Sequence, residues 1–146
     1  MRIAVLNGPN LNLLGTREPE IYGATTLADI ESRLLEVARE LDVELWLQQT
    51  NHEGALIDAI QGLRGSADGA IINAGAFSHT SLALRDALAA VMVPYVEVHL
   101  SNIFAREPER RHSMLAAGAR AVLCGVGAYG YELALRGLVA RLAPRA

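Results

Sequence analysis

The chain has 146 residues, of which 51% are hydrophobic and 20% are charged, and its formal net charge is −3 at pH 7. This composition is typical of one globular domain and excludes a disordered or fibrous chain. The longest apolar stretches are too short for a membrane span, and the segment from Met1 to Leu6 is too short for a signal-peptide core. A slightly negative chain without a basic stripe is not expected to bind nucleic acid or a membrane surface.

Two residue counts narrow the chemistry further. The single cysteine, Cys124, excludes an internal disulfide and is typical of a cytoplasmic protein, in which we expect a buried, unreactive thiol. All thirteen basic residues are arginine. Genome composition is the simplest cause of that bias, but its chemical consequence holds in any case. Without lysine the protein cannot form a Schiff base with a carbonyl substrate and cannot be a P-loop NTPase.

Short apolar runs alternate with stretches of helical periodicity along the whole chain, which is typical of repeated βα units. The predicted strands are 2–6, 43–48, 70–74, 95–99 and 119–124. A helix is predicted from Leu27 to Leu41, begun by a capping box of Thr26 and Asp29. Further helices are predicted at 55–63, 81–90, 110–117 and 131–142. We therefore expect a single α/β domain over residues 1–146, a flavodoxin-like doubly wound five-stranded parallel sheet with helices on both faces.

Ligands of such sheets bind beyond the carboxyl ends of the strands, and polar residues follow four of the predicted strands. They are Asn10, Arg17 and Tyr22; Asn51 and Glu53; Asn73, His79 and Ser81; and His99, Ser101, Arg106 and Arg110. The loop from Asn7 to Thr25 far exceeds the usual connection of roughly 4 to 6 residues, which predicts a lid. Leu11, Leu13 and Leu14 are expected to anchor it. A solvated Arg17 and an outward Tyr22 are the ordinary interpretation of such a loop, but the other polar residues favour a functional role.

His79 lies where a helix is predicted to begin, so free backbone amides there would suit an anion or a polyhydroxy compound. The alternative is that Ser78 or Thr80 caps the helix and the histidine is incidental. A metal site formed by His79 and His99 is disfavoured, because no closely spaced metal-ligand motif accompanies them.

Glu97 and His99 lie two residues apart on a predicted strand, so their side chains project to one face and the carboxylate could orient the imidazole. A carboxylate buried in a central strand is costly unless it is paired. The alternative is a structural ion pair in the core. Arg106, Arg110 and Arg111 follow closely. The ordinary interpretation is that these arginines are exposed at the start of a helix and pair with neighbouring charges. The alternative is that one or two of them face the cleft and bind a carboxylate.

Taken together, these residues resemble the type II 3-dehydroquinate dehydratases over essentially the whole chain. The resemblance rests on spaced blocks that occur in the same order. They are Asn7 to Gly15, Arg17 to Pro19, Tyr22-Gly23, Asn51 to Gly54, Asn73, His79 to Ser81, Glu97 to Asn102, Ala105 to Glu107, Arg111 to Ser113 and Gly130-Tyr131.

The resemblance implies a flavodoxin-like fold and the reversible dehydration of 3-dehydroquinate to 3-dehydroshikimate, in the shikimate pathway or in quinate breakdown, without a metal or organic cofactor. It implies that Tyr22 removes the C2 proton, that Arg17 supports it from the lid, and that His99 protonates the departing C1 hydroxyl. Asn10 and Glu97 belong to the same catalytic group. The implied substrate-binding residues are Asn73, His79, Leu100, Ser101 and Arg110. Asp86 would reach a neighbouring subunit's site in a homododecamer built of trimers.

Because a lysine Schiff base is excluded, the carbanion must be carried as an enolate. A tyrosine hydroxyl with an ordinary pKa of about 10 is ionised in only about one molecule in a thousand at pH 7, so Tyr22 needs a nearby cation. Arg17 is the candidate, with a second arginine after His99 as a helper. The chain departs from the usual family pattern at Ala74, Phe77, Phe104 and Pro108-Glu109. The last of these places the carboxylate of Glu109 beside Arg110. The alternative function is a flavodoxin-like flavin-binding or phosphoacceptor module. An aromatic content of 5% disfavours flavin binding, because few rings are available to sandwich a flavin. A phosphoacceptor module is disfavoured because it needs acidic residues where this chain has Asn7 and Asn73.

Overall fold

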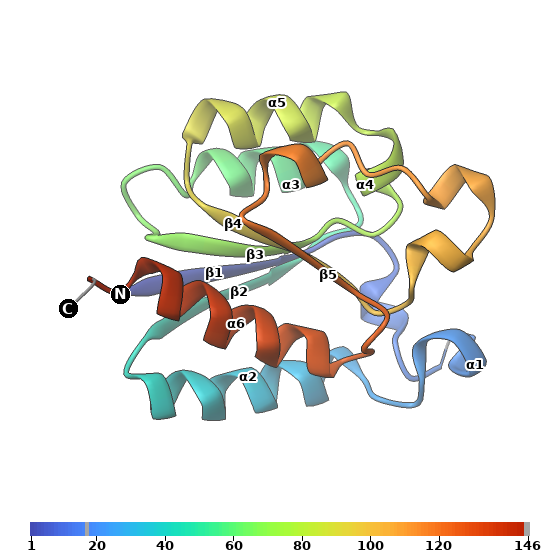
Figure 1. Ribbon diagram of the computed structural model, residues 1–146, viewed down its shortest axis with the longest axis horizontal. Helices are drawn as coiled ribbons and strands as arrows, with labels where there is room; N and C mark the ends of the chain where they lie inside the picture. The colour runs from blue at the N-terminus through green and yellow to red at the C-terminus, as the bar shows by residue number, and fades with distance from the viewer. Residues whose placement is uncertain (17, 145–146) are drawn as a thin grey trace.

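The computed structural model describes residues 1–16 and 18–144, and for Tyr22 the backbone alone. In this part of the chain, five parallel strands form one sheet in the order β2-β1-β3-β4-β5 (Figure 1). The strands are β1 (Arg2–Asn7), β2 (Glu44–Gln49), β3 (Gly69–Asn73), β4 (Tyr95–His99) and β5 (Ala121–Cys124). This is the flavodoxin-like order, and the predicted fold class is confirmed.

Helices cover both faces of the sheet (Figure 1). Helices α2 (Leu27–Leu41) and α6 (Tyr129–Leu142) lie on one face, and α3 (Glu53–Gln61) and α5 (Leu82–Val91) on the other. Alternate residues of β1 serve the two layers: Ile3 and Val5 pack with α2 and α6, whereas Ala4 and Leu6 pack with α3 and α5. The predicted capping box of α2 is confirmed, since Thr26 and Asp29 each bond the other's backbone N–H.

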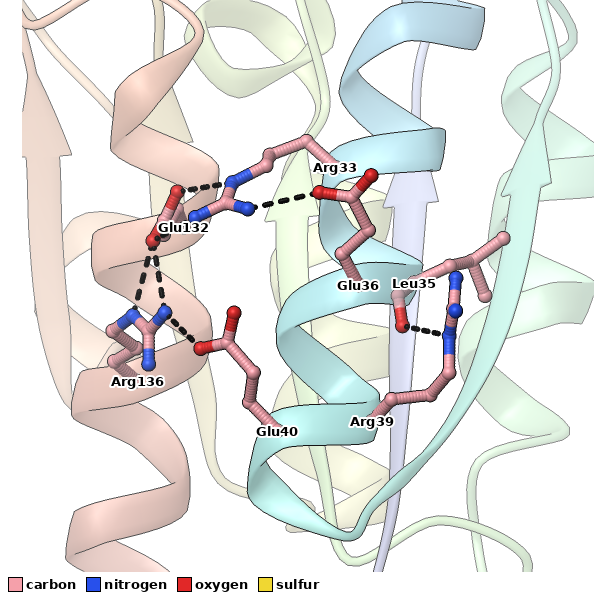
Figure 2. Close-up of polar contacts among 7 residues, drawn as sticks. All are labelled: Arg33, Leu35, Glu36, Arg39, Glu40, Glu132 and Arg136. Atoms are coloured by element: carbon pink, nitrogen blue, oxygen red, sulfur yellow. Dashed lines mark hydrogen bonds and ion pairs between the residues drawn. The ribbon is translucent and has the colours of Figure 1, made fainter.

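An ionic network joins α2 to α6 on the outer surface of their layer (Figure 2). The Arg33 guanidinium donates to both carboxylate oxygens of Glu132, at 2.9 and 3.0 Å. Arg136 donates to Glu132 at 3.1 Å and to Glu40 at 2.6 Å. Because Glu132 accepts from an arginine on each helix, it links two elements about a hundred residues apart in the sequence.

The loops that follow the strands begin at the carboxyl ends of the strands, and the N-terminus lies at the opposite edge of the sheet (Figure 1). They contain the short helices α1 (Pro19–Tyr22) and α4 (Phe77–Thr80) and the 3-10 turns η1 (Leu11–Leu13), η2 (Ile103–Ala105), η3 (Pro108–Arg110) and η4 (Ala116–Gly118). Leu11 and Leu14 anchor the first loop in the core as predicted, whereas Leu13 is exposed.

Two sequence-based expectations are wrong, the helix at 110–117 and the buried position of Cys124. Residues 110–117 do not form an α-helix, and a non-helical stretch separates η3 from η4. The reason is that polar groups of residues 112–115 form hydrogen bonds to residues distant in the sequence instead of helical bonds. Met114 N–H, for example, donates to Ser78 O at 2.8 Å. Cys124 ends the edge strand β5 and is only partly buried.

Among the described residues, no helix is both long and apolar enough to cross a membrane.

Candidate active site

A cleft opens at the carboxyl ends of β1, β3 and β4, the edge at which the sequence predicts a site. Its walls come from the loops that follow these three strands. The lining residues are Pro9, Asn10, Leu11, Leu14, Asn73, Gly75, Ala76, His79, His99, Leu100, Ser101, Ile103, Arg106 and Arg110. Seven predicted site residues are therefore brought together: Asn10, Asn73, His79, His99, Leu100, Ser101 and Arg110.

The turn that carries Asn10 is held by backbone packing. Gly8 N–H donates to Asn73 O at 2.8 Å, and a Cβ at Gly8 would lie 2.5 Å from the carbonyl oxygen of Ala74, so only glycine fits this approach. Asn10 has a φ of 68°, a left-handed conformation that asparagine tolerates. Its N–H donates to Asn51 Oδ1 at 2.9 Å, so Asn51 supports the turn from outside the cleft.

Asn73 ends β3 and is oriented by a buried chain of side chains. Its Nδ2 donates to the Tyr131 hydroxyl at 2.8 Å, and that hydroxyl donates to Asn7 Oδ1 at 2.6 Å. Gly75 N–H donates to Asn73 Oδ1 at 3.2 Å. Burial raises the pKa of Tyr131, so its hydroxyl stays protonated and bridges the two amides. The side-chain amide of Asn73 is thus fixed by two hydrogen bonds, one at Nδ2 and one at Oδ1.

His99 ends β4 beside the carboxylate predicted to orient it. His99 Nε2 lies 2.6 Å from Glu97 Oε1, and Glu97 is fully buried. The same oxygen accepts from the Ser113 hydroxyl at 2.5 Å. With Nε2 facing Glu97, Nδ1 is the ring nitrogen of His99 that remains for a substrate. The pair is therefore in place to hold and supply a proton.

His79 stacks on His99, with ring centroids 5.8 Å apart. Its Nδ1 lies 2.8 Å from the carbonyl oxygen of His112. Burial lowers the pKa of His79; the bond to His112 opposes this shift, and the charges of His99 and Arg110 add to it. The position differs from the prediction: His79 lies in the last turn of α4, and its N–H donates to Ala76 O. It does not offer a free amide to an anion, and the cap of the following helix is Ser81.

Two of the three candidate arginines line the cleft. Arg106 and Arg110 face it, whereas Arg111 donates through Nε to Arg106 O at 2.8 Å. Arg110 is paired with Glu107 at 2.5 Å, although the sequence placed Glu109 next to it. Arg106 Nη1 lies 3.4 Å from Ser101 Oγ. Two cations at one wall suit an anionic substrate.

Two further predicted residues, Asp86 and Glu53, are not among the residues that line the cleft. Asp86 is exposed on α5, where its side chain lies beside Arg85, and Glu53 begins α3. Tyr22 ends α1 in the same long loop as Asn10, and Arg17 lies outside the described residues. Within residues 1–16 and 18–144, no cluster of three or more His, Cys, Asp or Glu side chains is arranged to hold a metal ion.

Three residues that support the site were missed at the sequence level: Asn7, Tyr131 and Ser113. Asn7 and Tyr131 lie 124 positions apart, and no spacing rule connects them. Ser113 lay in a segment predicted to be helical. The one available signal was that Asn7, Ser113 and Tyr131 all belong to the sequence blocks that carry the family resemblance.

The sheet order and the position of the cleft define a flavodoxin-like α/β protein with a polar site at its strand ends. A family model described as "Dehydroquinase class II" matches residues 1–139. The chain belongs to the class II dehydroquinase family.

Individual relatives agree over almost their whole length. The chain is 63% identical to the 3-dehydroquinate dehydratase of Gemmatimonas aurantiaca, covering 97% of this chain and 93% of that protein. It is 56% identical to a catabolic 3-dehydroquinase of Pyricularia oryzae, covering 99% and 93%. The crystal structure of the type II dehydroquinase from Propionibacterium acnes superposes with a TM-score of 0.91 at 44% identity, covering 95% and 96% of the two chains.

Proposed function

We propose that the cleft catalyses the reversible dehydration of 3-dehydroquinate to 3-dehydroshikimate. The observation that carries the proposal is the buried Glu97–His99 pair, whose histidine lines a cleft together with Asn73, Arg106 and Arg110. This arrangement offers a proton donor beside groups that suit an anionic, polyhydroxylated ring. It lies in a chain whose relatives are named for this activity.

The elimination begins with removal of a proton. Tyr22, as tyrosinate, takes the proton from C2, and the electrons of that C–H bond move into the C3 carbonyl to form an enolate. Arg17 stabilises the tyrosinate by its charge. Both roles rest on the sequence and the family, since Arg17 and the Tyr22 side chain lie outside what the structure describes.

The enolate then collapses, the bond between C1 and its hydroxyl oxygen breaks, and His99 gives that oxygen a proton so that water leaves. Glu97 keeps the imidazole aimed and compensates its positive charge. Asn10, Asn73, His79 and the Leu100-Ser101 segment hold the ring hydroxyls. Arg110, with Arg106 on the same wall, balances the negative charge of the substrate.

The assembly that we propose is a homododecamer built of trimers. Asp86 supports it, because its side chain is 68% exposed on α5 and lies outside the cleft of its own subunit. From there it can serve a neighbouring subunit's site. Sedimentation equilibrium decides between a monomer, a trimer and a dodecamer. The cytoplasm is the compartment that we propose, on the sequence argument from Cys124.

The direct test is ultraviolet absorbance after purified protein is mixed with 3-dehydroquinate, because the product is a conjugated enone and the substrate is not. We expect absorbance to rise within minutes, and no change over hours would overturn the proposal. A flavin carrier is not favoured, because no Trp, Tyr or Phe is among the described residues that line the cleft. A colourless purified protein would agree.

A further inference from the structure

Residues 112–115 lie outside the cleft, yet they hydrogen-bond to the elements that carry both of its histidines. The His112 carbonyl lies 2.8 Å from His79 Nδ1, and the Ser113 hydroxyl lies 2.5 Å from Glu97 Oε1. Backbone bonds fix the segment itself, because Met114 N–H donates to Ser78 O at 2.8 Å. The Tyr95 hydroxyl of β4 donates to Leu115 O. The segment is therefore anchored to both α4 and β4.

The His112 carbonyl determines which nitrogen of His79 carries the proton. A carbonyl oxygen can only accept, so Nδ1 must be the N–H of a neutral His79. The lowered pKa of His79 keeps the ring neutral, which leaves Nε2 as an acceptor. The His112 side chain takes no part in this bond, which comes from its backbone.

Ser113 acts on the other histidine through Glu97. Leu115 N–H donates to Ser113 Oγ at 3.1 Å, so the Ser113 hydrogen is left to point at Glu97 Oε1. That oxygen lies 2.6 Å from His99 Nε2, which makes Nε2 the N–H of His99. The second oxygen, Glu97 Oε2, is buried and has no hydrogen-bond partner among the described residues. One of the two donors that hold the buried carboxylate is therefore Ser113.

We infer that the dipeptide His112-Ser113 is a positioning element that sets opposite tautomers on the two cleft histidines, Nδ1–H on His79 and Nε2–H on His99. Ser113 is a positioning residue rather than a catalytic one, because it does not line the cleft. With these tautomers, His79 offers Nε2 as an acceptor, and neutral His99 offers Nδ1 as the nitrogen that takes up a proton and, once protonated, can release it. The kinetic part of this inference rests on the proposed function, whereas the tautomers do not.

The test is Ser113→Ala, with Ser113→Thr as the conservative variant that keeps the hydroxyl. The matched control is Ser78→Ala, since Ser78 is also a buried serine but its hydroxyl has no partner among the described residues. The chain has four histidines, so the imidazole ¹⁵N shifts can be assigned by single substitutions. These shifts report the tautomer directly. If Ser113→Ala does not fold, Ser113→Cys replaces it, because the thiol keeps the volume but donates weakly.

In Ser113→Ala we expect the His99 ¹⁵N pattern to move from the Nε2–H tautomer toward a mixture, while the His79 pattern is unchanged. We expect kcat to fall by roughly tenfold, because the buried carboxylate loses a hydrogen bond, with KM within about threefold. Ser113→Thr should restore both kcat and the ¹⁵N pattern, and Ser78→Ala should change neither.

An unchanged His99 pattern in Ser113→Ala overturns the inference, whether kcat falls or not, because a loss of rate without a tautomer change is a structural effect. A wild-type protein that does not turn over 3-dehydroquinate refutes the proposed function instead. The ¹⁵N spectra still decide the tautomers in that case.

Discussion

The imidazole rings of His79 and His99 stack 5.8 Å apart at an interplanar angle of 22°, but their hydrogen-bond partners differ in charge. His99 lies against the carboxylate of Glu97, whereas His79 lies against a neutral backbone carbonyl. Two positive rings at this distance repel each other, and only one of them has a directly bonded anion. The two stacked rings therefore lie in different electrostatic surroundings, with the anion on the side of His99.

The first prediction concerns His79 and the pH dependence of stability. Its pKa in the folded protein lies below the usual value of 6.5, chiefly because of burial. The unfolded chain therefore binds this proton more readily, and the free energy of unfolding falls as pH drops below about 6.5. His79→Asn removes the titration and keeps an N–H donor for the His112 carbonyl. We expect the variant to show a flatter profile between pH 7 and pH 5 in urea unfolding at one fixed protein concentration.

His52→Asn is the control for His79, because His52 is exposed before α3 and its side chain makes no capping bond. It should leave the wild-type profile unchanged. Equal slopes for wild type and His79→Asn would show that His79 is not the group that titrates.

A second prediction concerns the buried bridge from Asn7 through Tyr131 to Asn73. Tyr131→Phe keeps the ring but leaves two buried amides without their shared partner, which costs about 1–3 kcal/mol of unfolding free energy. Because Asn73 Nδ2 then loses its partner and the side chain is held only through Oδ1, KM should rise severalfold. Urea unfolding and steady-state kinetics measure both effects. Tyr129→Phe is the control, because Tyr129 lies in the same helix with its side chain exposed. Similar losses in the two variants would argue against the bridge.

The fold could be predicted from the sequence because its cause is local and repeated. The run from Ile3 to Leu6 is apolar at every position, as a strand covered on both faces requires, and it is completely buried. Thr26 and Asp29 marked the start of α2 for a similarly local reason. The helix predicted at 110–117 was wrong because the Arg and Ala residues of this segment favour a helix locally. In the structure the segment instead forms hydrogen bonds to Ser78 and Glu97.

The site was predictable where a residue's own position determined its role. Glu97 and His99 share a face because they lie two apart on one strand, and their bond follows from that spacing. Roles that depend on tertiary contacts were not predictable. Asp86 could be assigned only through the family resemblance, and the partner of Arg110 proved to be Glu107 rather than the adjacent Glu109.

A third prediction tests the base. Tyr22→Phe removes the only group to which we assign the C2 proton, so turnover should be abolished. Substrate affinity, measured by calorimetry, should stay within several-fold of wild type because the cleft residues are untouched. Turnover like that of the wild type would reassign the base.

A fourth prediction tests the stabiliser of the tyrosinate. Arg17→Ala removes a positive charge that favours ionised Tyr22, so the rate should fall by at least about tenfold, and the rising limb of its pH profile should move to higher pH. The profile of kcat over pH 6 to 10 measures this. Arg64→Ala is the control, since Arg64 is exposed after α3 and lies outside the cleft. A lower rate with an unmoved profile would give Arg17 a binding role instead.

The last prediction concerns the ionic network between α2 and α6. Arg33, followed by Arg136, holds the pKa of Glu132 below its usual value of 4.5. The stability that Glu132 contributes is therefore present above about pH 4.5 and is lost as pH falls through its lower folded pKa. Glu132→Gln should lower the unfolding free energy at pH 7 and flatten its decline in acid, with the difference shrinking in high salt. Glu36→Gln should do less, because Glu36 contacts Arg33 alone and does not join the two helices. If the two variants have the same effect, the network contributes as separate surface pairs and does not fasten α6 to α2.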